Sequence, residues 1–120
     1  MFRKVTSLIL LTFCFAGCSS LAPLTEQDVK DRFQAAKSIK VNSDRDEALS
    51  SLAVKAAKQG MYEITEDILI DIGLNNLRDS TRQKCAIILA NQGKTAEATR
   101  IAKSIGLNDL RDKTLIKIAK

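Results

Sequence analysis

The chain repeats itself at a fixed interval. Residues 72–79 read IGLNNLRD, and the segment 33 positions later, at 105–112, reads IGLNDLRD. The longer segments GLNNLRDSTRQKCA (73–86) and GLNDLRDKTLIKIA (106–119) share nine of 14 residues. An earlier copy, KVNSDRDEALSSLA (40–53), keeps the asparagine, the Arg-Asp pair and the alanine in the same register. A repeat of this length is typical of stacked supersecondary units, each of which buries its apolar face against its neighbours.

The apolar residues between these repeated segments have helical spacing. Leu49, Leu52, Ala53 and Ala56 share one helical face, and no stretch of the repeat alternates as a strand does. The sequence therefore predicts an all-α fold, a short α-solenoid of antiparallel helix pairs with about 2.5 units. The expected first helices of each pair (A helices) are 44–58, 77–91 and 110–119; the second (B helices) are 61–72 and 94–105, and 26–39 is a B-like helix.

The residues that flank the helices suggest how each helix begins and ends. Ser43, Asn76 and Asp109 occupy equivalent positions and are predicted N-caps, with Asp46, Asp79 and Asp112 completing capping boxes three residues later. Glycines 60, 73, 93 and 106 stand where helices are expected to stop, which predicts a left-handed backbone at each of them.

The helix pairs resemble the tetratricopeptide repeat over residues 44–119. The residues that carry the resemblance are Leu52, Ala53, Ala56, Gly60, Tyr62 and Leu69 in one unit and Ala86, Leu89, Gly93 and Ala98 in the next. The chain departs from that pattern in having Thr65 where alanine is usual, no proline between units, and a period of 33. HEAT-like and other α-solenoid pairs therefore remain alternatives, whereas the TPLHxA stretch of ankyrin repeats is missing.

The resemblance implies a peptide-binding groove along the A helices. The residues that it places in the groove are Glu47, Ser50, Val54, Lys58, Gln83, Ile87, Asn91 and Lys113. A separate expectation concerns the last A helix, which has no B helix after it. Its apolar residues Leu115, Ile116 and Ile118 are expected to form an exposed edge that binds a partner or a second copy.

The N-terminal segment is typical of an export signal. A basic start (MFRK) precedes an apolar run of 12 residues, shorter than the roughly 20 needed to span a bilayer. The following FAGC resembles the lipobox of bacterial lipoproteins, which implies cleavage after residue 17 and lipidation of Cys18. The expected organisation is a signal peptide at 1–17, a lipidated cysteine and linker at 18–25, and a helical domain at 26–120. Ser19 after the cysteine implies the outer membrane, facing the periplasm, in preference to the inner membrane.

The composition argues against most kinds of catalysis. The chain has no histidine, which removes the commonest general base and most zinc sites. Cys85 occupies the repeat position of Leu52 and Ile118 and is predicted to be buried and unreactive. The carboxylates of Glu63, Glu66, Asp67 and Asp71 fall on one helix without the loop oxygens of a calcium site, so a solvated acidic face is expected. We expect no cofactor and no metal.

Charge gives no indication of nucleic-acid binding. Loss of Arg3 and Lys4 with the signal peptide leaves 17 of 19 basic residues against 14 acidic ones, a net charge of +3. The excess lies near the C-terminus, in a chain expected to be exported.

These features together predict a non-enzymatic, lipid-anchored periplasmic scaffold or envelope assembly adaptor that binds a protein or peptide. The alternative is a self-associating structural lipoprotein, or one of the immunity or exclusion type, and a homo-oligomer is compatible with either.

Overall fold

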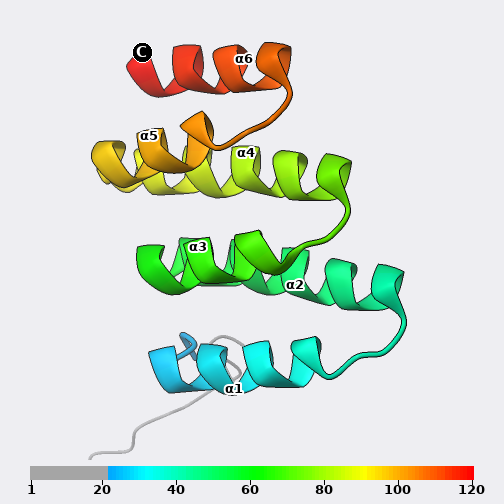
Figure 1. Ribbon diagram of the computed structural model, residues 1–120. Helices are drawn as coiled ribbons and strands as arrows, with labels where there is room; N and C mark the ends of the chain where they lie inside the picture. Colours follow the sequence, from blue (N-terminus) through cyan, green and yellow to red (C-terminus); the bar gives the residue numbers. More distant parts are fainter. Residues whose placement is uncertain (1–21) are drawn as a thin grey trace, which may run out of the picture.

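The computed structural model describes residues 22–120 (Figure 1). Over this range the chain forms six α-helices and no strand, which confirms the predicted all-α fold class. The helices are α1 (Glu26–Lys37), α2 (Asn42–Lys58), α3 (Tyr62–Asp71), α4 (Asn75–Asn91), α5 (Thr95–Lys103) and α6 (Asn108–Ala119).

The helices stack in the order in which they occur in the sequence. Figure 1 shows the chain rising from α1 to α6, with α3 in front of α2 and α5 in front of α4. The A helices α2, α4 and α6 pack on one another in succession, and the B helices α3 and α5 each pack against the A helix before and the A helix after. Interactions are therefore made mainly between neighbours along the array.

The buried core runs along the stack between the layer of A helices and the layer of B helices. Its largest fully buried side chains include Leu49 in α2, Ile68 and Leu69 in α3, Leu89 in α4 and Ile101 in α5. Four alanines on the A helices are also fully buried, namely Ala53, Ala56, Ala57 and Ala86. Small side chains at these positions let the paired helices approach closely, and burial of apolar surface supplies the main stabilising free energy.

Every predicted helix is present, but the A helices begin two residues earlier than expected. The predicted N-caps are wrong: Ser43, Asn76 and Asp109 all lie inside the first helical turn. The observed N-cap residues of α2, α4 and α6 are Val41, Leu74 and Leu107, which have extended backbones and make no side-chain cap. Among the described helices, only α1 carries a capping box, formed by Thr25 and Asp28.

The four glycines of residues 22–120 divide into two kinds. Gly60 and Gly93 have φ angles of 72° and 81° and end α2 and α4 in the predicted left-handed conformation. The same prediction is wrong for Gly73 and Gly106, which do not have positive φ angles. Their role lies in the contacts between repeats.

Candidate functional site

Asp46 joins the first repeat to the second. Its side chain is buried in α2, and its Oδ2 accepts a hydrogen bond of 2.9 Å from the backbone amide of Leu74, the residue that precedes α4. A carboxylate at this place satisfies an amide that the helix itself leaves unpaired, and it interacts favourably with the helix dipole. The N-terminus of α4 is thus stabilised by a side chain of the preceding repeat.

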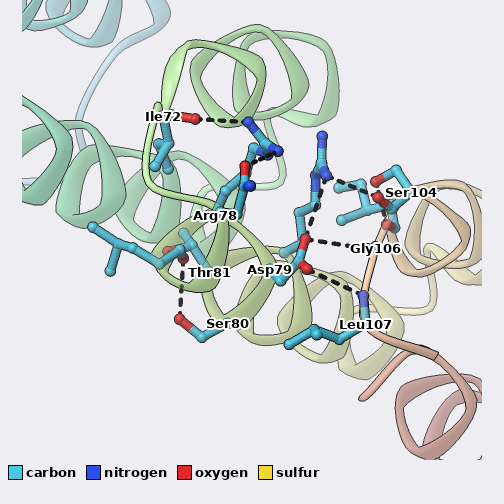
Figure 2. Close-up of polar contacts among 12 residues, drawn as sticks. Ile72, Arg78, Asp79, Ser80, Thr81, Ser104, Gly106 and Leu107 are labelled. Atoms are coloured by element: carbon cyan, nitrogen blue, oxygen red, sulfur yellow. Dashed lines mark hydrogen bonds and ion pairs between the residues drawn. The ribbon is translucent and has the colours of Figure 1, made fainter. Parts of the chain in front are cut away.

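Asp79 makes the equivalent contact between the second repeat and the third, and each such contact between an aspartate and the turn of the next repeat is called a joint. Its two carboxylate oxygens accept hydrogen bonds of 3.2 Å each from the amides of Gly106 and Leu107, ahead of α6 (Figure 2). Arg82 lies 3.6 Å from the same carboxylate and donates a 2.8 Å hydrogen bond to the Ser104 carbonyl at the end of α5. One side-chain cluster therefore stabilises both sides of the turn between α5 and α6.

The glycines of these turns make room for the carboxylates. A Cβ at Gly73 would lie 3.3 Å from Asp46 Oδ2, and a Cβ at Gly106 would lie 3.3 Å from Asp79 Oδ2. Both distances are tighter than ordinary van der Waals contact, so a larger residue would displace the carboxylate. The repeated glycine and the repeated aspartate are two halves of one contact.

A pocket of about 350 Å³ lies between α2 and α4. Four of the eight predicted groove residues line it, namely Glu47, Ser50, Val54 and Lys58, together with Ser51, Lys55, Leu77 and Lys84. Beside it, the hydroxyls of Ser50 and Thr81 are hydrogen-bonded at 2.7 Å, which fixes the two helices relative to each other. The pocket is mixed in character, with aliphatic side chains next to three lysines and one glutamate.

The other four predicted groove residues do not line this pocket. Gln83 and Ile87 are half-buried on α4, and Asn91 is exposed at its end. Lys113 lines a different pocket of about 500 Å³ at the start of α6, with Leu107, Asn108, Asp109 and Leu110. The structure thus brings together the groove residues of the first unit and leaves those of the later units apart from them.

Only part of the apolar edge predicted on α6 is exposed. Leu115 and Ile118 are half-buried and pack against the core, whereas Ile116 is 54% exposed. Asp112, on the outer part of the same helix, has a side chain that is 67% exposed.

Two features were missed by sequence reasoning. A third pocket, of about 500 Å³, lies between α1 and α2 beside Ala35, Ile39 and Leu52. In addition, Val41, Leu74 and Leu107 are each at least half exposed, at equivalent positions of successive repeats. The sequence contained a signal for this pocket, because residues 26–39 match a B helix and, within residues 22–120, no A helix precedes them.

The titratable groups singled out from the sequence are the Cys85 thiol and the carboxylates of α3. Burial raises the pKa of the Cys85 thiol to about 12, so the thiolate needed for nucleophilic attack is strongly disfavoured. The acidic face of α3 ends at Asp71, which lies 4.0 Å from Lys37 of α1. Over residues 22–120 no three acidic or cysteine side chains converge as a metal site would require.

The predicted lipidation site, Cys18, lies outside the described residues. Among the helices that are described, none is both long and apolar enough to cross a membrane. Comparisons with protein-family models, with curated proteins and with solved structures find no match to this chain.

Proposed function

We propose that this protein is a lipid-anchored, non-enzymatic interaction scaffold of the bacterial envelope. In this proposal Cys18 carries the lipid, the chain faces the periplasm from the outer membrane, and the helices form a short tetratricopeptide-like α-solenoid. The bound partner is a peptide or protein segment that occupies the pocket between α2 and α4.

The observation that carries the proposal is the composition of that pocket. Val54 and Leu77 offer apolar contact, while Lys55, Lys58 and Lys84 surround it with positive charge against one carboxylate, Glu47. Concave sites with an apolar base and a few charged groups are suited to peptide recognition, and the lysines select for acidic side chains or a free carboxylate. The proposed ligand is therefore an extended segment with an acidic group next to apolar residues.

A pocket of about 350 Å³ accommodates only a few side chains. A ligand of this size gains little from buried area alone, and electrostatic complementarity contributes mainly to specificity and to the rate of association. Lipid anchoring raises the effective concentration of the scaffold near other envelope proteins, which allows a weak contact to be used.

The test is photocrosslinking in cells that express the full chain. A photoreactive residue at position 54 is expected to give a discrete adduct with another envelope protein. The double substitution K58E and K84E should weaken the adduct by roughly tenfold or more, since two favourable charge contacts become repulsive. Cys18→Ser, which removes the anchor, should reduce the yield.

The matched control is the same photoreactive residue at position 70. Ile70 is 61% exposed on α3 and lines none of the pockets on α2, so it reports non-specific capture. Equal adducts from positions 54 and 70, or an adduct that charge reversal leaves unchanged, would refute the proposal.

A further inference from the structure

The first and last helices of the described array are of opposite type, so one could pack on the other as neighbouring A and B helices do. The first described helix, α1, corresponds to a B helix, since residues 36–39 (AKSI) recur at 102–105 and α1 packs on α2 as α5 packs on α6. The last described helix, α6, is an A helix. Within residues 22–120, no A helix packs ahead of α1 and no B helix packs beyond α6.

The outer face of α1 lacks the cover that its counterparts have. Arg32 and Ala35 are exposed and Ile39 is half-buried, whereas their equivalents in the next repeat, Thr65, Ile68 and Ile72, are fully buried. The pocket of about 500 Å³ lies along this face, beside α2. For α3, the helix that provides the corresponding cover is α2, an A helix.

The outer face of α6 is open in the same way. Its residues Asp112, Leu115 and Ala119 are exposed or half-buried. The residues at the same positions of α2, two repeats earlier, are Asp46, Leu49 and Ala53, and all three are buried. They are covered by the packing of α3 and α4 on α2.

The joint itself is also open at both ends. Asp112 is the third member of the series Asp46, Asp79, but its side chain is 67% exposed, against 2% and 6% for the first two. The turn before α2, at Lys40 and Val41, is the counterpart of the turns that these aspartates cap. Among the described residues, no carboxylate accepts a hydrogen bond from the amides of Lys40 and Val41.

We propose that a second copy of this chain docks head to tail, with α6 of one copy filling the pocket beside α1 of the next. In this arrangement Asp112 caps the turn at Lys40 and Val41 of the neighbouring copy, continuing the joint that Asp46 and Asp79 make within the chain. The contact is heterologous, so it propagates into an open stack or closes into a ring. It does not depend on what the pocket between α2 and α4 binds.

Lys40 sets the strength of this contact. The positions equivalent to Lys40 are Gly73 and Gly106, where a Cβ would lie 3.3 Å from the capping carboxylate. A carboxylate at the turn of a second copy meets that Cβ and must shift by a few tenths of an ångström. The joint between copies is therefore weaker than those within the chain, and association is reversible.

The test uses photocrosslinking from position 35, which is exposed on α1, in the full chain in cells. The expected product migrates as a dimer or larger, and mass spectrometry of the linked peptides joins α1 of one copy to α6 of another. Asp112→Ala should reduce this product by roughly tenfold, because two charge-assisted hydrogen bonds are lost. Lys40→Gly should increase it several-fold, since the Cβ that crowds the carboxylate is gone.

The control positions separate this arrangement from other occupants of the two faces. A photoreactive residue at position 70, away from both ends, should give no such product, and K58E with K84E should leave the product unchanged. An adduct joining α6 to α6, an adduct of position 35 with residues 1–25 of its own chain, or capture of a different protein at both ends would overturn the proposal. So would a product that neither Asp112→Ala nor Lys40→Gly alters.

Discussion

Asp79→Ala tests whether the joint between repeats contributes to stability. The Asp79 side chain is 6% exposed and accepts hydrogen bonds from the amides of Gly106 and Leu107, 3.2 Å away in each case. Loss of a helix cap costs about 0.5–2 kcal/mol, and hydrogen bonds to a charged group contribute about 1.5–3 kcal/mol. Arg82 also loses its neighbouring carboxylate, 3.6 Å away.

Water limits the cost of this substitution. Gly106 and Leu107 are exposed residues, so water replaces part of the hydrogen bonding that their amides lose. We therefore expect a decrease in the free energy of unfolding of about 2 kcal/mol, where the two ranges overlap. For a domain of this size, such a loss corresponds to a decrease in Tm of roughly 10 °C.

The chain provides a matched control for this prediction. Asp112 has the same position in the last repeat, but its side chain is 67% exposed. Asp112→Ala should change the free energy of unfolding by less than about 0.5 kcal/mol, as is usual for exposed positions. Asp79→Asn keeps one acceptor oxygen without the charge and should give an intermediate loss of about 1 kcal/mol.

The assay is urea unfolding followed by circular dichroism, at a protein concentration where sedimentation shows only monomer. Hydrogen exchange on the same variants should localise the effect, because amides in α6 depend on the joint directly whereas those in α2 belong to an earlier repeat. If Asp79→Ala and Asp112→Ala cost the same, the contact between repeats contributes nothing and the reasoning from the joint is refuted.

Three other predictions follow from the geometry of single residues. Thr25→Ala should lower the free energy of unfolding by about 1 kcal/mol, because it removes the capping box of α1, whereas Ser43→Ala, inside α2, should change it by less than about 0.5 kcal/mol; equal losses in urea titrations would contradict the observed helix starts. Cys85 should react with a thiol reagent at pH 8 only on unfolding, because its pKa of about 12 in the folded state lies above the unfolded value of about 8.5. The free energy of unfolding should therefore fall as pH rises between those two values, by up to about 1.4 kcal/mol per pH unit. Cys85→Ala should lack this pH dependence. Gly106→Ala should destabilise the wild type by about 1 kcal/mol but be neutral or stabilising in the Asp79→Ala background, where no carboxylate meets the new Cβ; additive effects in this double-mutant cycle would refute the proposed contact.

The helices themselves were predictable from the sequence. Apolar residues at helical spacing and a glycine after two of the A helices define α2 and α4 to within two residues, because both signals depend on the local chain alone. The repeat added a check that a single helix does not offer, since three copies place the same boundaries in register.

The helix caps were predicted wrongly for a physical reason. Ser43 and Asp46 have the spacing of a capping box, and so do Asn76 and Asp79, but the aspartates are used elsewhere. Asp46 and Asp79 reach amides in the turn of the following repeat, and Asn75 accepts a hydrogen bond from Arg78. A local pattern cannot reveal a contact made by a distant turn unless the stacking of the repeats is known.

The candidate groove rests on the tetratricopeptide resemblance, and its role in binding stays a prediction. The resemblance implies a groove beside Glu47, Ser50, Val54 and Lys58, and all four line one pocket on α2. Leu77 and Lys84 reach the same pocket from α4, at positions that depend on the offset between the helices. That offset is set by side-chain packing, including the hydrogen bond between Ser50 and Thr81, which no spacing rule supplies.

The repeated motif can now be understood residue by residue. In IGLNNLRD, the isoleucine is buried and the glycine leaves room for a carboxylate from the repeat before. The leucine amide donates a hydrogen bond to that carboxylate, and the aspartate caps the turn of the repeat after. The terminal copies differ in what they keep. The first has Lys40 in place of the glycine, and the last retains Asp112 although no described turn follows it. The Lys40 side chain disfavours a carboxylate at the turn before α2, whereas Asp112 supplies a carboxylate that could cap such a turn in a neighbouring copy. Lys40→Gly and Asp112→Ala should therefore move association in opposite directions while leaving the folded monomer unchanged, a pair of effects that a purely internal role for the motif does not produce.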